Sequence, residues 1–260
     1  MASDTTQDGG TVRVDIETTD RGEIAHLTID HMQRRNAMGP AVILSMFSAA
    51  HELTARDSLR AVILRGSQGI FSAGANVKIM AGLDPDGARA FITSLHNCIN
   101  AVRNLPVPTI AVLEGRCYGA AMELAAACDM RIASSDMIAG MPEVRVGIPS
   151  VIEACLLPRL IGWGKTSELL LTGRDLDASE AERIGFVERH VDGADVDRSV
   201  KDWIDMILGC APEAVRSQKR VMRGWESDDS DGIEASIQAF SDAFLTDEPA
   251  SYLGPLAGKK

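Results

Sequence analysis

The sequence predicts an α/β protein in which a mixed core is followed by a helical C-terminal part. Two observations support this prediction. Up to about Ser150 the apolar pattern runs in the order strand, loop, helix, strand, which is the rhythm of a βα repeat. After Ser150 the apolar spacing is almost entirely helical. No internal repeat or low-complexity segment divides the 260 residues, so we expect one α/β core with helices after it.

The N-terminal elements are predicted from alternation and turn residues. Thr11 to Thr18 and Glu23 to Asp30 alternate apolar and polar residues on either side of Asp20-Arg21-Gly22, which indicates a β-hairpin. A loop from His31 to Met38 leads to Gly39-Pro40. Because proline favours the first position of a helix, we expect a helix from about Ala41 to Ala55.

The rest of the core alternates between strands and helices. The predicted elements are a continuously apolar strand at Arg60 to Gly66, a loop at Phe71 to Ala75, a helix from about Asp86 to Asn104, a strand at Pro108 to Leu113, a helix at Ala120 to Cys128, a strand at Met130 to Ala133 and a short extended piece at Val144 to Gly147. After it, helices are predicted at 150–160, 164–171, 178–184, 195–209, 211–225 and 231–246, with one short strand at Phe186 to His190.

Composition excludes several classes of function. The net charge of −11 and the pI near 4.9 argue against nucleic acid, whose binding needs a basic face. No apolar run approaches the roughly 20 residues that span a bilayer, and the first ten residues are polar. We therefore expect a cytoplasmic protein that does not bind membranes. The five cysteines form no C-x-x-C pair, so neither zinc nor a disulfide is expected.

One stretch, Glu114 to Pro149, combines the features of an active site. Gly119 precedes an apolar helical run that carries a single charge, Glu123, about one turn from its start. The first amides of a helix have no internal partner and can bind developing negative charge. A second carboxylate, Glu143, follows Pro142 at the end of a loop. Taken alone, Glu123 could also be a residue that only satisfies the helix dipole.

Three motifs in this order resemble the enoyl-CoA hydratase/isomerase (crotonase) superfamily. They are FSAGANVK from Phe71, GAAMELAAACDMRIAS from Gly119 and MPEVRVGIP from Met141. The resemblance covers nearly the whole chain. It implies a spiral of ββα repeats with a helical C-terminal trimerisation region, and a homotrimer or a dimer of trimers. The corresponding division is a flexible N-terminus at 1–10, the spiral core with the active site at 11–195, and the oligomerisation region at 196–260.

The resemblance also implies an activity, the hydration of a 2-enoyl-CoA to a 3-hydroxyacyl-CoA or the reverse dehydration. Glu123 and Glu143 occupy the two glutamate positions of the family's hydratases, where two carboxyls that share one water can act as base and acid. The backbone amides of Ala75 and Ala120 match the family's oxyanion hole. Alanines at 120 and 121 depart from the family's common glycine triplet and fill space beside the thioester.

For coenzyme A, the family's placement selects the basic loop Arg34 and Arg35 together with Lys78, since arginine binds phosphate in bidentate fashion. These basic groups could equally be a solvated loop. The implied contact residues of the coenzyme are Arg34, Arg35, Ala73, Ala75, Asn76, Val77, Lys78 and, in the tail, Lys259. Asn76 replaces a frequent aspartate of the family and cannot act as a base. Coenzyme A travels as part of the substrate, so no separate cofactor and no metal are expected.

Several alternatives remain open at the level of sequence. The same scaffold hosts isomerases that shift a double bond with one glutamate, as well as hydrolases and decarboxylases. A non-catalytic relative that binds a partner or RNA is a further alternative. Ser150 to Leu157 replaces a small, glycine-rich stretch of the hydratases with bulkier side chains. Within it, Glu153 is either a third carboxylate near the acyl pocket or a salt-bridged residue of a first helical turn. The length and branching of the acyl group stay undetermined.

Overall fold

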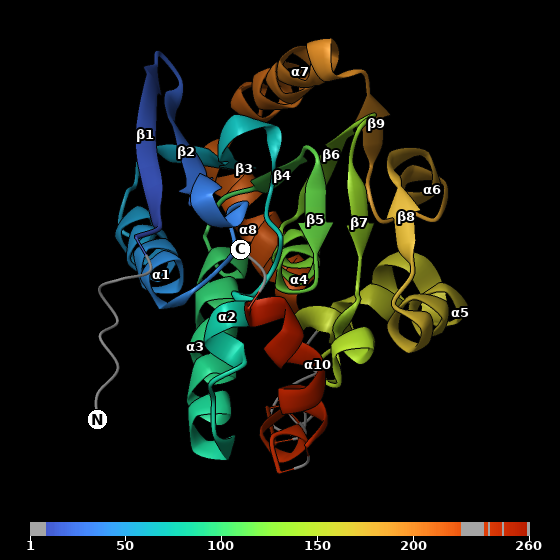
Figure 1. Ribbon diagram of the computed structural model, residues 1–260. Helices are drawn as coiled ribbons and strands as arrows, with labels where there is room; N and C mark the ends of the chain where they lie inside the picture. The colour runs from blue at the N-terminus through green and yellow to red at the C-terminus, as the bar shows by residue number, and fades with distance from the viewer. Residues whose placement is uncertain (1–8, 225–236, 239, 246, 259–260) are drawn as a thin grey trace.

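A computed structural model describes residues 9–224, 237–238, 240–245 and 247–258 of the chain. Its largest sheet has six strands in the order β1-β2-β3-β4-β6-β9 (Figure 1). β1 and β2 form the predicted antiparallel hairpin, and the other neighbours are parallel. The bounds of these strands are Thr11–Thr19, Gly22–Asp30, Leu59–Gly66, Thr109–Leu113, Met130–Ser134 and Arg189–Val191.

A second, smaller layer of strands lies beside the first. It contains β5 (Arg116–Tyr118), β7 (Ile138–Gly140) and β8 (Asp175–Asp177) in that order. Two isolated bridges, Met38 with Ala75 and Ser72 with Cys117, continue this layer toward the N-terminal half. The chain therefore places one strand in each layer before it enters a helix, as in β4, β5 and α4. This winding of ββα turns is the architecture expected from the sequence.

Helices surround both layers. The α-helices with described bounds are α1 (Pro40–Thr54), α2 (Val77–Met80), α3 (Pro85–Arg103), α4 (Ala120–Ala127), α5 (Leu157–Thr172), α6 (Ala178–Arg183), α7 (Val196–Gly209), α8 (Pro212–Gly224) and α10 (Glu248–Ala257). Short 3-10 helices lie at η2 (Met32–Arg34), η3 (Ser67–Gly69), η4 (Glu143–Val146), η5 (Ile152–Leu156) and η6 (Gly193–Asp195).

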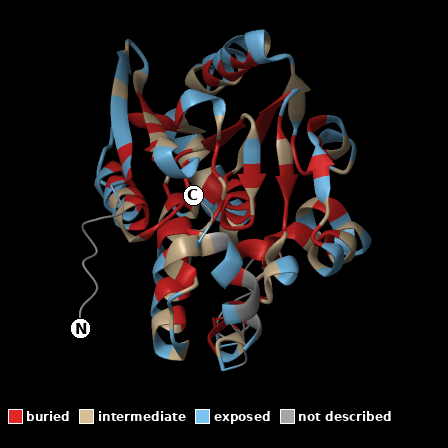
Figure 2. Cartoon of the chain, in the orientation of Figure 1, coloured by how far each residue is buried: buried red, intermediate tan, exposed pale blue. Residues whose placement is uncertain are grey.

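The core is divided by the main sheet. One face packs against α1, α3 and α4, and every residue of α4 is buried, so this helix is red in Figure 2. The other face packs against α7, whose Val196, Val200 and Ile204 meet Ile24 and Ile63 of the sheet. β3 is buried along most of its length, as its continuous apolar run predicts. The central position of α4 makes its N-terminus a fixed point between the layers.

Several sequence predictions were wrong in detail. Val144 to Gly147 is not extended, because Glu143–Val146 forms the 3-10 helix η4. The helices predicted at 150–160 and 164–171 are instead η5 followed by one helix, α5, whose backbone departs from helical angles at Gly162 (φ 75°, ψ 158°). The strand predicted at Phe186 to His190 forms later, as β9. β5, β7, β8, α2 and α10 were not predicted, and the helix predicted at 231–246 lies partly outside the described residues.

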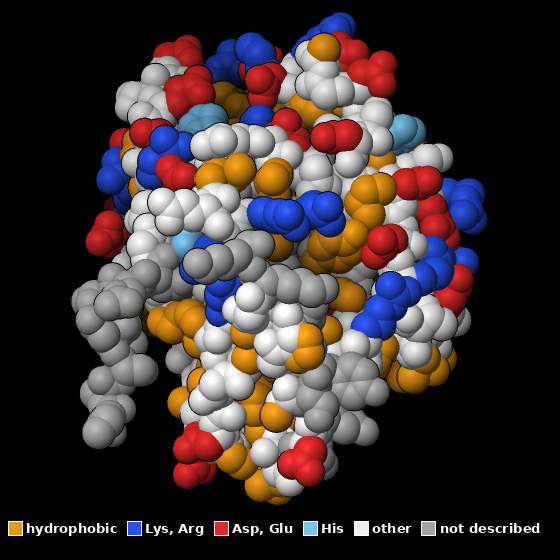
Figure 3. Space-filling model, in the orientation of Figure 1, with side chains coloured by type: hydrophobic (Ala, Val, Ile, Leu, Met, Phe, Trp, Pro, Cys, Tyr) orange, Lys and Arg blue, Asp and Glu red, His pale blue; other side chains and the backbone are white. Residues whose placement is uncertain are grey.

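Charge is mixed on the surface seen in Figure 3, where Lys and Arg lie among Asp and Glu rather than on one side. Within the described part of the chain, no helix is both long and apolar enough to cross a membrane. The division at 195 and the oligomerisation region at 196–260 stay predictions. In the described segments, α10 packs against α2 and η4 of its own chain.

Candidate active site

A cavity of about 330 Å³ lies where the N-terminus of α4 meets the loop before α2. Its walls come from the loop before α2 and from α2, from α3, from the end of β5 and the start of α4, from the segment around η4, and from Phe240 near the C-terminus. The lining residues are Ala73, Gly74, Ala75, Val77, Met80, Phe91, Ile92, Leu95, Tyr118, Gly119, Ala120, Glu123, Pro142, Glu143, Arg145, Val146, Ile148, Pro149, Val151 and Phe240. Among the titratable side chains in this set, two are carboxyls, Glu123 and Glu143. An apolar cavity with a few converging polar groups is typical of a small-molecule site.

α4 is held in place at its C-terminal end by Arg131, a buried residue of β6. Its guanidinium donates to the carbonyls of Ala125 (3.1 Å) and Cys128 (2.8 Å), and it also pairs with Glu188. The last carbonyls of a helix have no internal partner, so a cation there satisfies them and complements the helix dipole. Asp129, in the same motif, accepts from Thr109 and from Lys219 of α8. The CDMR segment is therefore a structural clamp behind the site.

The loop before α2 is fixed by Ser72 and Asn36. The Ser72 hydroxyl donates to the Asn36 carbonyl (2.7 Å) and accepts from the Gly74 amide (3.0 Å). The Asn36 side chain is fully buried and donates to the carbonyls of Ser67 and Ile70. The Met38 amide donates to the Gly74 carbonyl, and the Met38 carbonyl accepts from the Asn76 amide, so Met38 and Ala75 form a parallel β-bridge. The Ala75 amide therefore lies on the side of the loop that faces away from Met38. These contacts set the direction of the Ala75 N–H.

The loop and the start of α4 lie in close contact. A Cβ added to Gly74 would lie 2.4 Å from the Tyr118 carbonyl and 3.6 Å from the Ala120 nitrogen. Gly74 also has φ +88°, a conformation that suits glycine. Within the described residues, neither the Ala75 amide nor the Ala120 amide donates to a protein acceptor. Two such amides on one cavity wall can bind the same oxygen, which is the requirement of an oxyanion hole.

Glu123 lies inside this cavity with its side chain almost wholly buried, at 3% exposure. One carboxyl oxygen, Oε1, accepts from the Ala154 amide at 3.2 Å. Burial raises the pKa of Glu123 well above 4.5, and the nearby carboxyls of Glu143 and Glu153 raise it further. These effects outweigh the lowering by backbone amides. Glu123 is thus a carboxyl that keeps its proton to a higher pH than a solvated glutamate does.

Glu143 stands at the start of η4, just after Pro142. Its Oε2 accepts from the Ser150 hydroxyl at 2.8 Å, and its Oε1 lies so close to Gly119 that an added Cβ would be 2.3 Å away. Burial raises the pKa of Glu143 too, while its own amide and Ser150 lower it. The two predicted carboxyls therefore share one cavity. They differ in their hydrogen-bond donors, because Glu143 accepts from a hydroxyl and Glu123 accepts from a backbone amide.

The third carboxylate, Glu153, does not line this cavity. It is fully buried, and its Oε1 is hydrogen-bonded to His96 Nδ1 of α3 at 2.7 Å. Both interpretations made from the sequence apply in part. Glu153 is paired in a short helix, η5, and its charge also reaches Glu123.

Three of the residues predicted to hold coenzyme A, namely Ala73, Ala75 and Val77, belong to the cavity wall. The Arg35 carbonyl accepts from the Ala73 amide, which ties the exposed Arg34-Arg35 turn to the same loop. The Asn76 side chain is buried and caps α2 by accepting from the Lys78 amide at 3.1 Å. Lys259 lies outside the described residues.

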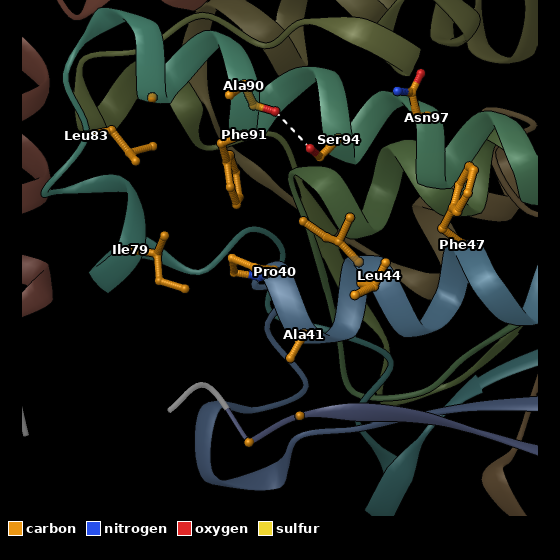
Figure 4. Close-up of a pocket in the computed structure, with 14 residues that line it drawn as sticks. Pro40, Ala41, Leu44, Phe47, Ile79, Leu83, Ala90, Phe91, Ser94 and Asn97 are labelled. Carbon is orange, nitrogen blue, oxygen red and sulfur yellow. Dashed lines mark hydrogen bonds between the residues drawn. The ribbon is translucent and has the colours of Figure 1, made fainter. Parts of the chain in front are cut away.

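A larger hollow of about 980 Å³ lies between α1 and α3. Figure 4 shows Leu44 and Phe47 of α1 facing Phe91 and Ser94 of α3 across it. Its lining contains no titratable side chain, so it offers no acid or base chemistry. Phe91 lines both this hollow and the smaller cavity and therefore separates them. We assign the chemistry to the smaller cavity.

Sequence reasoning did not single out Asn36, Ser72, His96 or Arg131, although all four support the site. Ser72 lies in the FSAGANVK motif and Arg131 in the GAAMELAAACDMRIAS motif, and their place in these motifs is the only sequence feature that could have indicated a role. Asn36 and His96 reach the site from other segments of the chain, so no local pattern marks them.

Comparisons with known proteins identify the family of the chain. The profile of the enoyl-CoA hydratase/isomerase family matches residues 19–253. A probable enoyl-CoA hydratase of Mycobacterium tuberculosis is 34% identical over 236 residues, which cover 90% of this chain and 91% of that protein. The short-chain-enoyl-CoA hydratase of Clostridium acetobutylicum is 31% identical over 230 residues, which cover 87% of this chain and 88% of that one.

Among solved structures, an enoyl-CoA hydratase/isomerase from Xanthobacter autotrophicus Py2 superposes with a TM-score of 0.82 at 26% identity and covers 95% of this chain and 98% of that one. The fold is thus of the crotonase type. The chain belongs to the enoyl-CoA hydratase/isomerase family.

Proposed function

We propose that the protein hydrates a 2-enoyl-CoA to the 3-hydroxyacyl-CoA, or catalyses the reverse dehydration. One observation carries this proposal: two carboxyls, Glu123 and Glu143, line a single apolar cavity beside two amides that donate to no described protein acceptor. Relatives named as enoyl-CoA hydratases support the same chemistry. Coenzyme A enters as part of the substrate, and no separate cofactor takes part.

The amides of Ala75 and Ala120 bind the thioester oxygen in this proposal. Addition of water at C3 of the conjugated double bond moves negative charge onto that oxygen, and two fixed N–H donors stabilise it without reorganisation. Loss of one such donor in other enzymes costs about 3 kcal/mol. The position of Ala120 at the first residue of α4 adds the positive end of the helix dipole.

The two carboxyls supply base and acid. The ionised carboxyl removes a proton from a water molecule whose oxygen bonds to C3, while the protonated carboxyl delivers a proton to C2. Burial raises the pKa of both carboxyls, and the charge of Glu143 raises that of Glu123 further, so in this proposal the two act as a coupled pair of base and acid. Burial and two flanking carboxylates favour Glu123 as the member that carries the proton at rest. The Ser150 hydroxyl stabilises the ionised form of Glu143.

Phosphate recognition is assigned to Arg34, Arg35 and Lys78. Both arginines are exposed on the turn that holds the Ala73 amide, and Lys78 lies at the start of α2 on the far side of the same loop. Arginine pairs well with phosphate oxygens. Replacement of both arginines should therefore raise KM for a CoA thioester much more than it changes kcat.

A double-bond isomerase is the second candidate, and the apolar character of the cavity favours it, since that reaction needs one carboxyl and no water. Incubation of a panel of 2-enoyl-CoA thioesters in water labelled with heavy oxygen separates the two. Hydration places the label on C3 of the product, with the preferred chain length given by the panel. Product without the label, or with a moved double bond only, would reject the hydratase assignment.

A further inference from the structure

A fully buried carboxylate behind the candidate active site has no evident structural need to be charged. Glu153 has 0% exposure, and one of its oxygens, Oε1, is hydrogen-bonded to His96 Nδ1 at 2.7 Å. Its other oxygen, Oε2, is buried without a hydrogen-bond partner in the described structure. A buried polar atom in this state costs about 1–3 kcal/mol, so its retention calls for a function.

The backbone beside Glu153 is also strained, in the same turn that contacts the candidate active site. Ile152 has φ +42°, which is rare for a β-branched side chain and costs about 1–3 kcal/mol. The following residue, Ala154, donates its amide to Glu123 Oε1. The same turn thus buries the Glu153 carboxylate and holds the Glu123 carboxyl. Strain of this kind persists where surrounding contacts enforce a particular geometry.

His96 connects this turn to α3. Its side chain is 18% exposed, so the imidazole reaches solvent while its Nδ1 faces the buried carboxylate. Leu95, its neighbour, lines the active-site cavity, but neither His96 nor Glu153 does. The pair therefore acts on substrate only through another residue, and Glu123 is the reactive group held by the same turn.

We propose that His96 and Glu153 are a positioning pair that fixes the direction of the Glu123 carboxyl through the turn they share with the Ala154 amide and sets the charge beside that carboxyl. The proposal rests on the proposed hydratase function for its catalytic meaning. Two groups face Glu123, namely Glu143 from η4 and Glu153 from η5. Glu153 in turn faces His96 and the buried Cys98 of α3, and its charge contributes to raising the pKa of that thiol to about 12. Negative charge on Glu153 disfavours a second negative charge on Glu123.

The test measures the ionisation of Glu123 directly, in the substrate-free protein. Glutamate labelled with ¹³C at the carboxyl carbon reports each side chain by NMR, and the resonance absent from Glu123→Gln identifies Glu123. In Glu153→Gln, whose amide oxygen can still accept from His96, the midpoint for Glu123 should fall by about one pH unit or more. The alkaline limb of kcat/KM should move by the same amount.

A matched control is provided by a second histidine–glutamate pair remote from the cavity. Glu182 Oε2 lies 3.0 Å from His190 Nδ1 between α6 and β9. Glu182→Gln removes the charge from the same type of contact and should leave the Glu123 titration and the pH profile unchanged. An equal shift in both variants, or no shift in Glu153→Gln, would overturn the proposal.

The other side of the pair keeps the proposal testable if Glu153→Gln fails to fold. His96→Ala removes the hydrogen bond that fixes Glu153 in the turn behind Glu123, so the Glu123 midpoint should shift. His96→Gln, which can still donate, should restore it. An unchanged midpoint in His96→Ala would count against the pair. The NMR titration needs no turnover, so its result does not depend on the proposed function. The proposed function is rejected by a different result, namely that the wild-type protein hydrates no 2-enoyl-CoA.

Discussion

Gly119→Ala offers the sharpest probe of the site geometry. Gly119 precedes α4 with φ 53° and ψ −121°, and a Cβ there would lie 2.3 Å from Glu143 Oε1 and 3.3 Å from its carboxyl carbon. Real Cβ contacts of this kind are not found below about 3 Å, so the carboxyl must move. Because the obstructing atom is the end of a flexible side chain, the fold can yield there without displacement of backbone.

The expected magnitude has two parts. A displacement of somewhat more than about 1 Å is needed to reach ordinary contact, and a misplacement of that size costs about 10²-fold in rate, or about 2.7 kcal/mol in the barrier. Separately, an alanine held at positive φ costs about 1–3 kcal/mol of folding stability. The variant should remain folded with a lower Tm, while its kcat falls about a hundredfold.

Gly162→Ala separates these two effects. Gly162 has φ 75° and ψ 158°, and nothing lies within 4 Å of its added Cβ. It should therefore lose similar stability in thermal unfolding and keep near-normal turnover of a short-chain 2-enoyl-CoA. Normal kcat in Gly119→Ala, or an equal loss of kcat in Gly162→Ala, would show that the Glu143 carboxyl is not held at the reacting position.

Two further predictions concern stability. The pKa of Glu123 is raised above 4.5 in the folded protein, so the folded state binds more protons than the unfolded state above that pH, and stability falls as pH rises through this window. Glu123→Gln should therefore raise Tm at pH 8 and leave it nearly unchanged near pH 4, and a lower Tm at pH 8 would contradict the assigned burial. Arg131→Met removes the guanidinium bonds to the carbonyls of Ala125, Cys128 and Phe186 and the ion pair with Glu188. Urea denaturation should show a loss of about 3–5 kcal/mol, and a loss below about 1 kcal/mol would refute the clamp.

The sequence predicted those parts of the fold that long periodic segments determine. The β1–β2 hairpin, the buried strand β3 and the helices α1, α3 and α4 were all placed within a few residues of their observed bounds. The two glutamates were predicted to share one site, and they do line one cavity. Their positions follow from local chemistry, namely one charge in an apolar helix and one after a proline.

Features formed by contacts between distant segments could not be predicted in this way. β5, β7 and β8 have three residues each, too few for an alternation to register, and they exist because neighbouring strands pair with them. Glu143 begins a 3-10 helix that ends after one turn at Gly147 in the left-handed conformation, and an element this short shows no periodicity in the sequence. The partner of Glu153 lies 57 residues away on α3, so burial and pairing could be seen only in three dimensions.

The central claim is that two acidic side chains jointly add water to a bound thioester. It is tested most directly by the turnover of a 2-enoyl-CoA by Glu123→Gln and Glu143→Gln, each with its affinity for the product CoA ester measured by calorimetry. Each variant should bind the ester about as well as the wild type and lose about 10²–10⁴-fold or more in kcat. Turnover within a few-fold of wild type in either variant, with binding intact, would contradict the account.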